Sequence, residues 1–506
     1  MQNSPNTTLY TVSQVKEFDR ITIEEKGIPG LTLMRRAAGA CVIALQEAWP
    51  DANRIAVYCG SGNNAGDGYI VAGMLAEKGF EVRVVVVGDA QKLSSDAQKA
   101  REYCLDSNAF VHDFDPDIQF EADVIVDALL GIGAKGEVKS LYAAAIKKIN
   151  LRSAGVLSVD IPSGLDGDTG LVLGGGEKPV VKADITVSFI GLKRGLFTAG
   201  GVEFSGKVIF DDLGAEPVPN SGTRYLKYDE LIASLPRRKR QSHKNDFGHV
   251  LVIGGDRGMG GAVAMTAEAS LRSGAGLVSV FTHKDHASAM LARCPELMVR
   301  GVDELDQIEV VLEPLLARAK VIVLGPGLGQ GQWSEKVFQL TLGHIQRNEK
   351  PAVLDADALT MLAIIDFNNS DKNKYKSEHW VLTPHPGEAA RLLGEKIEDR
   401  FAAVSAIQAR FGGVALLKGA GTLIRDEHEM SLCPYGNPGM STAGMGDVLS
   451  GVIGALLAQS LSPYFATQLA VVVHALAADR CVKENGERGL LATDLMGNIR
   501  RLINDC

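Results

Sequence analysis

The chain has 506 residues, and at about 100–200 residues per domain this length predicts two or three domains. Hydrophobic residues make up 46% and charged residues 22% of the chain, as in globular proteins, and its 56 glycines indicate many tight turns and nucleotide-type loops. The formal net charge of −9 argues against a nucleic-acid surface as the main partner and favours small-molecule chemistry.

The seven cysteines form no C-x-x-C pair, which is typical of reduced thiols in a cytosol. The first ten residues lack a basic segment followed by an apolar one, so we expect no secretion signal. No uninterrupted apolar run reaches about 18 residues, so we expect no membrane-spanning segment and no membrane partner. A cytoplasmic protein is therefore predicted.

The first half of the chain alternates apolar strand patterns with helical ones. Thr11 and Gln14 have capping-box spacing before an amphipathic helix, and a second helical stretch runs from about Leu31 to Trp49. The expected strands are Arg54 to Cys59, Glu81 to Val87, Asp123 to Leu129, Gly155 to Ile161 and Asp184 to Ile190, with helices such as Asp67 to Lys78 and Leu141 to Ile149 between them. This alternation predicts a parallel sheet covered on both faces, with functional loops at the carboxyl ends of its strands.

A linker separates this series from a second one. The pattern lapses from Ala215 to Lys244, and we place the boundary so that the domains are residues 1–220 and 221–506. The basic run Pro236 to Lys244 is compatible with a nuclear signal or an anion patch, but a solvated linker is favoured, with only His243 and Lys244 near enough to the next strand to enter a site.

The second series contains further strands and a hairpin. The strands are His249 to Ile253, Leu277 to Phe281, Val321 to Leu324, Ala352 to Leu354, Trp380 to Leu382 and Val414 to Leu417, and the hairpin joins Thr422 to Arg425 with Met430 to Cys433. The predicted fold class is therefore α/β, with two parallel-sheet domains.

Polar residues follow three strands of the first half. The strand Arg54 to Cys59 runs into the glycine loop of residues 60–69, in which Asn63, Asn64 and Asp67 offer oxygens to a ligand or a hard cation, or cap the next helix. Asp127 and the loop Gly131 to Glu137 follow a second strand. Asp160 ends a third strand before a Pro-Ser-Gly turn, where it is placed either for proton transfer or as a turn former.

The segments GNNAGDG, DALLGIG, SVDIPSGLDGDTG and DITVSFIGLKRGL together resemble the N-terminal domain of the YjeF family, the NAD(P)H-hydrate epimerases, over residues 10 to 215. The resemblance implies a Rossmann-like fold and interconversion of the R and S forms of hydrated NADH and NADPH. It implies K⁺ coordination by Asn64, Asp127 and Ser163, and acid–base roles for Asp160 and Lys193. It also implies ligand contacts by Asp160, Asn63, Asn64, Gly131, Ile132, Gly133, Ala134, Lys135, Gly136 and Glu137.

A glycine-rich loop opens an apolar helical pattern at Gly436 to Gln459. Gly444, Gly446 and Asp447 lie where backbone N–H groups and the positive end of a helix attract a phosphate. A carboxylate at this position would repel a phosphate, so its presence indicates another task, and the obvious one is to accept or deliver a proton beside the phosphorylated atom. The alternative is that Asp447 only caps the helix. Five further motifs follow predicted strands: the loop Gly254 to Ala262, GPGLG at 325–329, DADAL at 355–359, TPHPGE at 383–388 and KGAGT at 418–422.

This set resembles the ribokinase-like superfamily and, within it, the YjeF C-terminal domain, the NAD(P)H-hydrate dehydratases, over residues 225 to 501. Members phosphorylate the hydrate's hydroxyl from a nucleotide and then eliminate phosphate. The resemblance implies that Asp447 is the base and that Gly444 to Gly446 stabilise the transferred charge. It implies hydrate contacts by Ala262, Gly327, His385 and Asp447, and nucleotide contacts by Lys418, Gly419, Ala420, Gly421, Thr422 and Gly446. Mg²⁺ is implied by nucleotide chemistry alone.

These resemblances predict a bifunctional repair enzyme that takes hydrated NADH or NADPH and ADP as substrates. The alternative is an ATP-dependent kinase of a vitamin precursor of the hydroxymethylpyrimidine type, with a first domain that only binds or scaffolds. We expect ADP rather than ATP as phosphate donor, and a homo-oligomer. The preference between the two hydrates stays open at this point.

Overall fold

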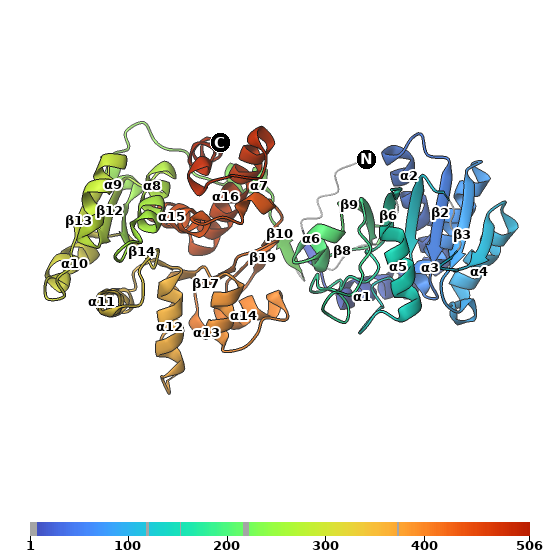
Figure 1. The fold of residues 1–506 in the computed structure, drawn as a ribbon, viewed down its shortest axis with the longest axis horizontal. Helices are drawn as coiled ribbons and strands as arrows, with labels where there is room; N and C mark the ends of the chain where they lie inside the picture. Colours follow the sequence, from blue (N-terminus) through green and yellow to red (C-terminus); the bar gives the residue numbers. More distant parts are fainter. Residues whose placement is uncertain (1–7, 118–120, 152, 216–221, 372–373, 506) are drawn as a thin grey trace. The chain divides into compact units, whose positions relative to one another are not determined.

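The computed structural model describes residues 8–117, 121–151, 153–215, 222–371 and 374–505. The chain divides into two compact units, Met1–Thr223 and Arg224–Cys506, each with helices packed on a sheet (Figure 1). The domain boundary predicted between residues 220 and 221 lies outside the described residues.

The first unit is built on a parallel sheet with strand order β4-β3-β2-β5-β6-β7-β9. Its strands are β2 (Arg54–Cys59), β3 (Glu81–Val86), β4 (Phe110–Asp113), β5 (Val124–Ala128), β6 (Gly155–Val159), β7 (Ile185–Phe189) and β9 (Lys207–Asp211), and a short parallel pair joins β1 (Thr8–Tyr10) to β8 (Leu192–Lys193). The chain moves outward from β2 to β3 and β4 and then returns to β5 on the other side of β2. Ligands of such sheets bind outside the carboxyl ends of the strands at this reversal.

Helices cover both faces of this sheet, as the apolar runs predict. They are α1 (Val12–Glu24), α2 (Gly30–Ala48), α3 (Asn63–Glu77), α4 (Ser95–Asp106), α5 (Ser140–Asn150) and α6 (Gly201–Phe204). Alternate strand residues enter different cores: Val57 packs in the cluster of α2, α3 and α4, whereas Tyr58 packs in the cluster of α5. The capping box of Thr11 and Gln14 is present at the start of α1.

Helix α3 begins at Asn63, four residues earlier than the glycine-rich loop suggested. The reason is packing, because a Cβ on Gly68 would lie 2.5 Å from the Cβ of Ala128 on β5. The glycine therefore serves a close helix–sheet approach inside a helix. As a consequence, Asn63 and Asn64 lie in the first turn of α3, directly after the carboxyl end of β2.

The second unit is built on a sheet with strand order β13-β12-β11-β14-β15-β16-β17-β18-β19-β10. The strands are β10 (Thr223–Tyr225), β11 (His249–Ile253), β12 (Leu277–Thr282), β13 (Met298–Gly301), β14 (Val321–Leu324), β15 (Ala352–Leu354), β16 (Trp380–Leu382), β17 (Val414–Leu417), β18 (Thr422–Arg425) and β19 (Met430–Cys433). The seven strands from β11 to β17 are parallel, and β18 and β19 form the antiparallel hairpin that the sequence predicts. The order reverses between β11 and β14, so the loops after these strands meet at one edge.

Figure 1 shows α8, α15 and α16 on one side of this sheet and α12, α13 and α14 on the other. The helices are α7 (Tyr228–Ala233), α8 (Gly260–Arg272), α9 (Ala287–Arg293), α10 (Gln307–Arg318), α11 (Gln332–Asn348), α12 (Asp357–Phe367), α13 (Pro386–Leu393), α14 (Arg400–Phe411), α15 (Met445–Ala458), α16 (Pro463–Asn485) and α17 (Leu495–Ile503).

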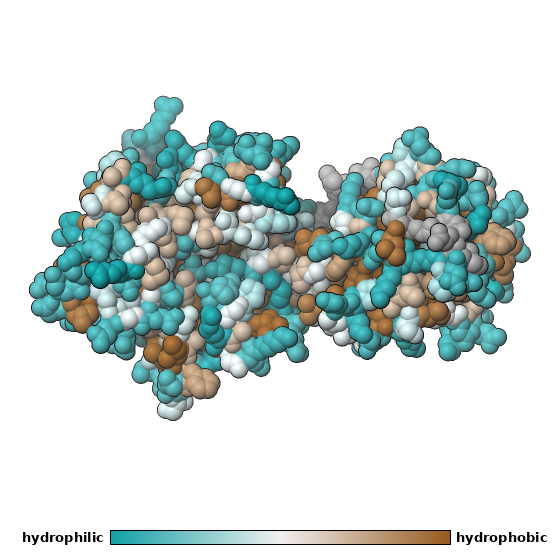
Figure 2. Space-filling model, viewed as in Figure 1, coloured by the Kyte–Doolittle hydropathy of each residue, from teal (hydrophilic) through white to brown (hydrophobic). Residues whose placement is uncertain are grey.

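Helix α16 is the one described helix that is long and apolar enough to cross a membrane by length and composition, but 72% of its apolar window is buried. Its buried residues belong to the core that α8 and α15 share, which explains its composition without a membrane. On the face drawn in Figure 2, the most hydrophobic residues are scattered among hydrophilic ones.

Candidate active sites

A cavity of about 720 Å³ lies at the carboxyl ends of β2, β5 and β6 in the first unit. It brings together nine of the residues that the sequence singled out: Asn63, Asn64, Asp67, Gly131, Ile132, Gly133, Ala134, Asp160 and Lys193. Lys135, Gly136 and Glu137 are not among its lining residues, and Glu137 instead forms an ion pair with Lys178.

An ion pair between Lys193 and Asp160 forms part of the cavity wall. Lys193 is only 1% exposed, and its Nζ also donates to the carbonyl of Phe189 at 2.8 Å and to the Ser188 hydroxyl at 3.2 Å. Asp160 has a φ of 66°, which is unusual for a residue other than glycine, and its Oδ1 accepts from the Phe189 N–H at 3.2 Å. The pair is thus held rigidly, with a carboxylate and an ammonium side by side for moving protons.

Two further carboxyl groups, Asp19 and Asp67, line the same cavity. Burial raises the pKa of Asp67 well above its ordinary value, and the negative charges of Asp160 and Asp19 add to this, against the opposing effect of Lys193. Burial and the charge of Asp160 likewise raise the pKa of Asp19. Carboxyl groups of different proton affinity around one ammonium are a common arrangement for acid–base work. Asp19 lies on the amphipathic helix α1, and nothing in the sequence distinguishes it from a solvated residue.

Of the three residues expected around K⁺, Asp127 and Ser163 are hydrogen-bonded to each other, and Asn64 lies beside the loop that follows Asp127. Asp127, at the end of β5, is fully buried, and its carboxylate accepts from the Ser163 hydroxyl at 2.6 Å and from the Ser163 N–H at 2.9 Å. Asn64 is buried against Gly131, and its Nδ2 has no hydrogen-bond partner within the described residues. Because the oxygen and nitrogen of an amide are interchangeable by rotation, the unpartnered position also accommodates an oxygen facing a cation. This oxygen-rich, buried set fits a monovalent cation.

In the second unit, the loops after β11 and β14 meet. Gly327, with a φ of 59°, packs against the start of α8, because a Cβ on it would lie 2.7 Å from the carbonyl oxygen of Met259, just before the helix, and 3.2 Å from the Cβ of Ala262 in the first turn. Two of the four residues expected to contact the hydrate are therefore neighbours, at the point where the strand order reverses.

A buried ion pair lies at the ends of β15 and β17. Lys418 Nζ donates to Asp355 Oδ1 at 2.9 Å, and the Ser450 hydroxyl on α15 donates to Asp355 Oδ2 at 2.8 Å. Burial opposes ionisation of Asp355, but the ammonium of Lys418 and these hydrogen bonds hold its pKa below the ordinary value. A Cβ on Gly446 would lie 3.2 Å from Lys418 Nζ, so the glycine loop and the pair adjoin. The sequence singled out the motif that contains Asp355 without giving this residue a role.

Asp447 lies in the first turn of α15, and the helix is capped by Gly444, whose φ is 90°. The alternative that Asp447 serves as the helix cap is therefore wrong. Burial raises the pKa of Asp447 to about 6, the charge of Asp355 adds to this, and the ammonium of Lys418 opposes it. A carboxylate with a pKa just below neutral is ionised at pH 7 and still accepts a proton readily, as a general base must.

His385, also expected to contact the hydrate, caps helix α13. Its Nδ1 accepts from the N–H groups of Gly387 at 2.9 Å and Glu388 at 3.3 Å. The ring lies beside the carboxylate of Glu388, whose pKa is raised by burial, and Glu388 in turn lies 3.9 Å from Lys418 Nζ. His385 therefore has a structural task that holds it next to the buried ion pair.

Two family models match the chain. One, described as YjeF-related protein N-terminus, matches residues 30–195, and the other, described as NAD(P)H-hydrate dehydratase, matches residues 250–501. The bifunctional NAD(P)H-hydrate repair enzyme of Coxiella burnetii is 45% identical over 507 residues, covering 98% of this chain and 100% of the relative. The chain belongs to the bifunctional NAD(P)H-hydrate repair enzymes.

Further relatives agree. The bifunctional NAD(P)H-hydrate repair enzyme of Escherichia coli is 40% identical over 515 residues, covering 100% of this chain and 96% of the relative. Among solved structures, a ribokinase-like superfamily protein of Enterococcus faecalis is 34% identical with a TM-score of 0.51, covering 57% of this chain and 98% of that structure. These findings confirm the two-domain α/β fold with a ribokinase-like second unit, and they favour the repair reading over the vitamin-precursor kinase.

Proposed function

We propose that this chain repairs hydrated NADH and NADPH in two steps carried by its two units. The first unit interconverts the R and S hydrates, and the second dehydrates the S hydrate to the intact cofactor while ADP becomes AMP and phosphate. The two steps belong together, because an S-specific dehydratase alone leaves the R epimer behind. The observation that carries the proposal is the juxtaposition of Gly446, Lys418 and Asp355 beside Asp447, whose pKa is raised to about 6.

In the second unit, Asp447 removes the proton of the hydrate's hydroxyl while that oxygen attacks the terminal phosphorus of the nucleotide. The N–H groups of Gly444 to Gly446 and the positive end of α15 stabilise the charge on the transferred phosphoryl group. The bond from this phosphorus to the AMP oxygen breaks as the new P–O bond forms. Phosphate then leaves the ring carbon with the C–O bonding pair, the neighbouring ring carbon loses a proton to the solvent, and the ring double bond forms again. Lys418 keeps its positive charge, since burial lowers its pKa less than the carboxylates of Asp355 and Glu388 raise it.

The remaining ligand contacts in the second unit are proposals as well. Ala262, Gly327 and His385 would contact the hydrate, and Gly419, Ala420, Gly421 and Thr422 would hold the nucleotide with Lys418. Mg²⁺ would neutralise phosphate charge, as is usual in phosphoryl transfer. Among the described residues no group of three or more His, Cys, Asp or Glu residues is placed to hold a metal ion, so phosphate oxygens would supply ligands to Mg²⁺.

In the first unit, Asp160 and Lys193 move protons on and off the hydroxyl or ring nitrogen of the hydrate, so that a bond from that heteroatom to the carbinol carbon breaks and re-forms on the opposite face. Asn63 and the loop from Gly131 to Glu137 would hold the ligand, although residues 135–137 do not line the cavity in this structure. Asn64, Asp127 and Ser163 would hold K⁺, which supplies a positive charge for a pyrophosphate or hydroxyl oxygen. The six free cysteines among the described residues are consistent with action in the reducing cytoplasm. The expected homo-oligomer would be tested by light scattering on the purified protein.

One progress curve tests both sites. With a mixture of R and S hydrates of NADH, wild-type protein and ADP should release NADH from the whole mixture, followed by absorbance. With Asp160→Asn, NADH release should end when the S form is consumed. The amplitude of NADH release should therefore fall, while its initial rate stays unchanged. Asp447→Asn should abolish NADH release while leaving R-to-S conversion intact.

Three results would contradict the proposal. A stable phosphorylated product without NADH release would exclude the dehydratase. Full amplitude in Asp160→Asn would exclude the role of that residue, and loss of both activities in Asp447→Asn would mean that the two sites are not independent. Parallel reactions with ADP and ATP, and with the hydrates of NADH and NADPH, determine the preferred donor and substrate.

A further inference from the structure

A cavity of about 840 Å³ in the second unit is lined by five arginines: Arg237, Arg238, Arg272, Arg500 and Arg501. It lies away from the candidate active site. Arg272 ends α8, whose first residues adjoin Ala262, and Gln459 of the cavity follows the end of α15, whose first turn carries Asp447. The cavity and the glycine loop are thus at opposite ends of the same two helices.

Within the part of the chain that the structure describes, carboxylates do not balance the positive charge of this cavity. Among the described residues, no carboxylate lies within 4.0 Å of the guanidinium groups of Arg237, Arg238, Arg500 or Arg501. Arg272 has a partner at 3.8 Å, Glu268, but that carboxylate is also bound by Arg293 at 2.9 Å. A chain with a net charge of −9 has therefore gathered unneutralised positive charge in one concave place.

Two of the arginines are held in place. Arg238 Nη2 donates to the carbonyl of Gly274 at 2.6 Å and to Gln459 Oε1 at 3.1 Å, and its guanidinium lies 3.7 Å from the ring centroid of Phe247. Burial lowers the pKa of Arg238, and no carboxylate counteracts this effect. Arg238 is thus fixed by neutral groups at the cavity wall, and these contacts leave its positive charge without a counter-charge among the described residues.

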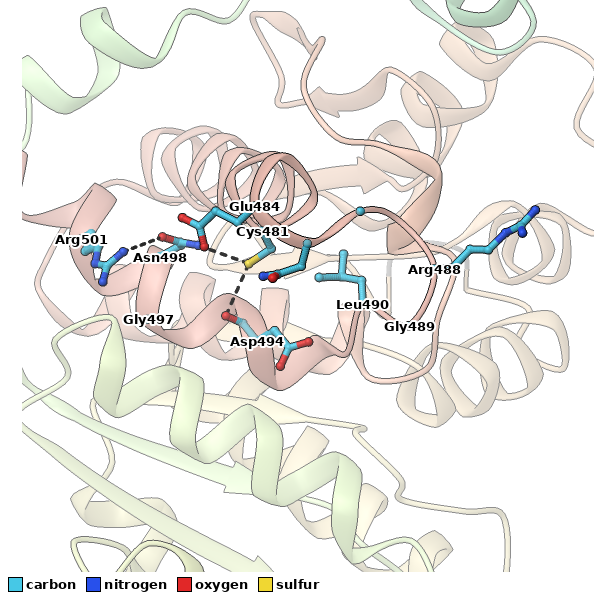
Figure 3. A pocket seen from close by; sticks show the side chains of 11 residues that line it. Cys481, Glu484, Arg488, Gly489, Leu490, Asp494, Gly497, Asn498 and Arg501 are labelled. Carbon is cyan, nitrogen blue, oxygen red and sulfur yellow. Dashed lines mark hydrogen bonds between the residues drawn. The ribbon is translucent and has the colours of Figure 1, made fainter.

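Arg501 is oriented from a neighbouring cavity of about 340 Å³, which it also lines. Figure 3 shows Arg501 donating to Asn498 Oδ1, at 3.5 Å, and Asn498 Nδ2 donating to Cys481 Sγ, at 3.2 Å. Arg488 points away from this smaller cavity (Figure 3). The chain of contacts anchors the base of the arginine cluster on the buried side of α16 and α17.

The arginine cavity also contains a buried polar group that is not satisfied. Ser273, at the end of α8, is 1% exposed, and its hydroxyl has no hydrogen-bond partner within the described residues. A buried hydroxyl without a partner is unfavourable, and an acceptor that reached it from the cavity would satisfy it.

We propose that this cavity binds a phosphorylated small molecule that carries at least two negative charges. Arginines bind phosphate through two parallel N–H donors, and several from different segments surround one polyphosphate. The volume is within the range of about 300–1,000 Å³ that holds nucleotide-sized ligands. The acidic remainder of the chain disfavours an extended polyanion such as nucleic acid, and a concave cluster suits a compact one. The basic run that we expected to be a solvated linker supplies two of the arginines.

The test measures binding of tripolyphosphate to the full-length protein by titration calorimetry. The wild type should bind it in addition to its nucleotide site, and Arg500→Gln combined with Arg501→Gln should weaken the additional binding at least about tenfold. The KM for ADP in NADH release should stay unchanged in this variant. Arg237→Gln, which alters an exposed loop residue and therefore leaves the core intact, should weaken binding in the same direction.

The matched control is Arg318→Gln combined with Arg425→Gln, which removes the same charge from exposed or partly exposed positions away from the cavity and should bind like the wild type. The proposal would be overturned if the cavity variants bound tripolyphosphate as tightly as this control. It would also be overturned if the KM for ADP rose by the same factor by which tripolyphosphate binding weakened. A third result would also overturn the proposal. The protein would bind a 20-base-pair DNA or phosphatidylserine vesicles through these arginines but would not bind tripolyphosphate, and the cavity would then belong to a large polyanion.

Discussion

Replacing Asp447 by asparagine should stabilise the protein while destroying dehydratase activity. The pKa of this carboxyl rises from an ordinary 3.8 to about 6 on folding. A raised pKa means that the folded state resists ionisation, so the stabilisation from the protonated form is complete below pH 3.8 and is lost as pH rises through 6. The shift of about two pKa units predicts that Asp447→Asn has a free energy of unfolding about 3 kcal/mol higher than that of the wild type at pH 8. About 2 kcal/mol of this difference should develop between pH 4.5 and pH 8.

The measurement is the free energy of unfolding of wild type and Asp447→Asn across this pH range. The chain contains three tryptophans, and Trp49 is in the first unit whereas Trp333 and Trp380 are in the second. In a Trp49→Phe background, tryptophan fluorescence therefore follows unfolding of the unit that holds Asp447. The difference between the two proteins, rather than either curve, cancels the titration of the groups that do not interact with Asp447.

The reasoning is refuted if Asp447→Asn is no more stable than the wild type at pH 8. It is equally refuted by a stability difference that does not change with pH, because such a difference would come from packing and not from the charge. The expected result is an example of an active-site group kept at a cost in stability.

Three further predictions concern the same sites. The kcat for NADH release should fall tenfold per pH unit below about pH 6, because the Asp447 base becomes protonated. A slope of two in the plot of log kcat against pH would refute a single titrating base. Lys193→Met should lower R-to-S conversion by about 10²–10⁴-fold, measured by chromatography of the epimers, while NADH release from pure S hydrate stays unchanged. Gly446→Ala would place a Cβ 3.2 Å from Lys418 Nζ and should lower kcat/KM for ADP by about tenfold or more, whereas Gly343→Ala, with only an ordinary contact at 3.6 Å, should leave it unchanged.

The strands of both sheets could be predicted closely from the sequence. Their apolar runs are short, nearly continuous and bounded by glycine or charged residues, and β2, β11 and β14 to β17 begin and end at the predicted residues. The edge strands β4, β9 and β13 were missed, because an edge strand is partly exposed and its sequence does not form an apolar run.

The site is predictable where residues lie at strand ends or at the start of a helix. Asp160 and Lys418 follow strands, and the parallel topology brings such residues to one edge of each sheet, whereas Asp447 lies in the first turn of α15 after a glycine-rich loop. Roles that depend on three-dimensional surroundings are not visible in the sequence. The raised pKa of Asp19 depends on burial beside Asp160, 141 positions away in the chain. The arginine cavity likewise assembles residues from separate segments, so the basic run alone indicated a linker.

Helices α8 and α15 pack more closely than ordinary helix pairs allow. A Cβ on Gly451 of α15 would lie 2.2 Å from the carbonyl oxygen of Thr266 on α8, and the Ser270 hydroxyl donates to the carbonyl of Gly451 at 3.0 Å. The two backbones are therefore in direct contact at mid-length, between the N–H groups proposed to cradle a phosphoryl group and the arginine cavity. Any side chain at Gly451 would have to push α15 away from α8, so the position of the proposed phosphoryl-binding loop depends on a contact in the middle of its helix.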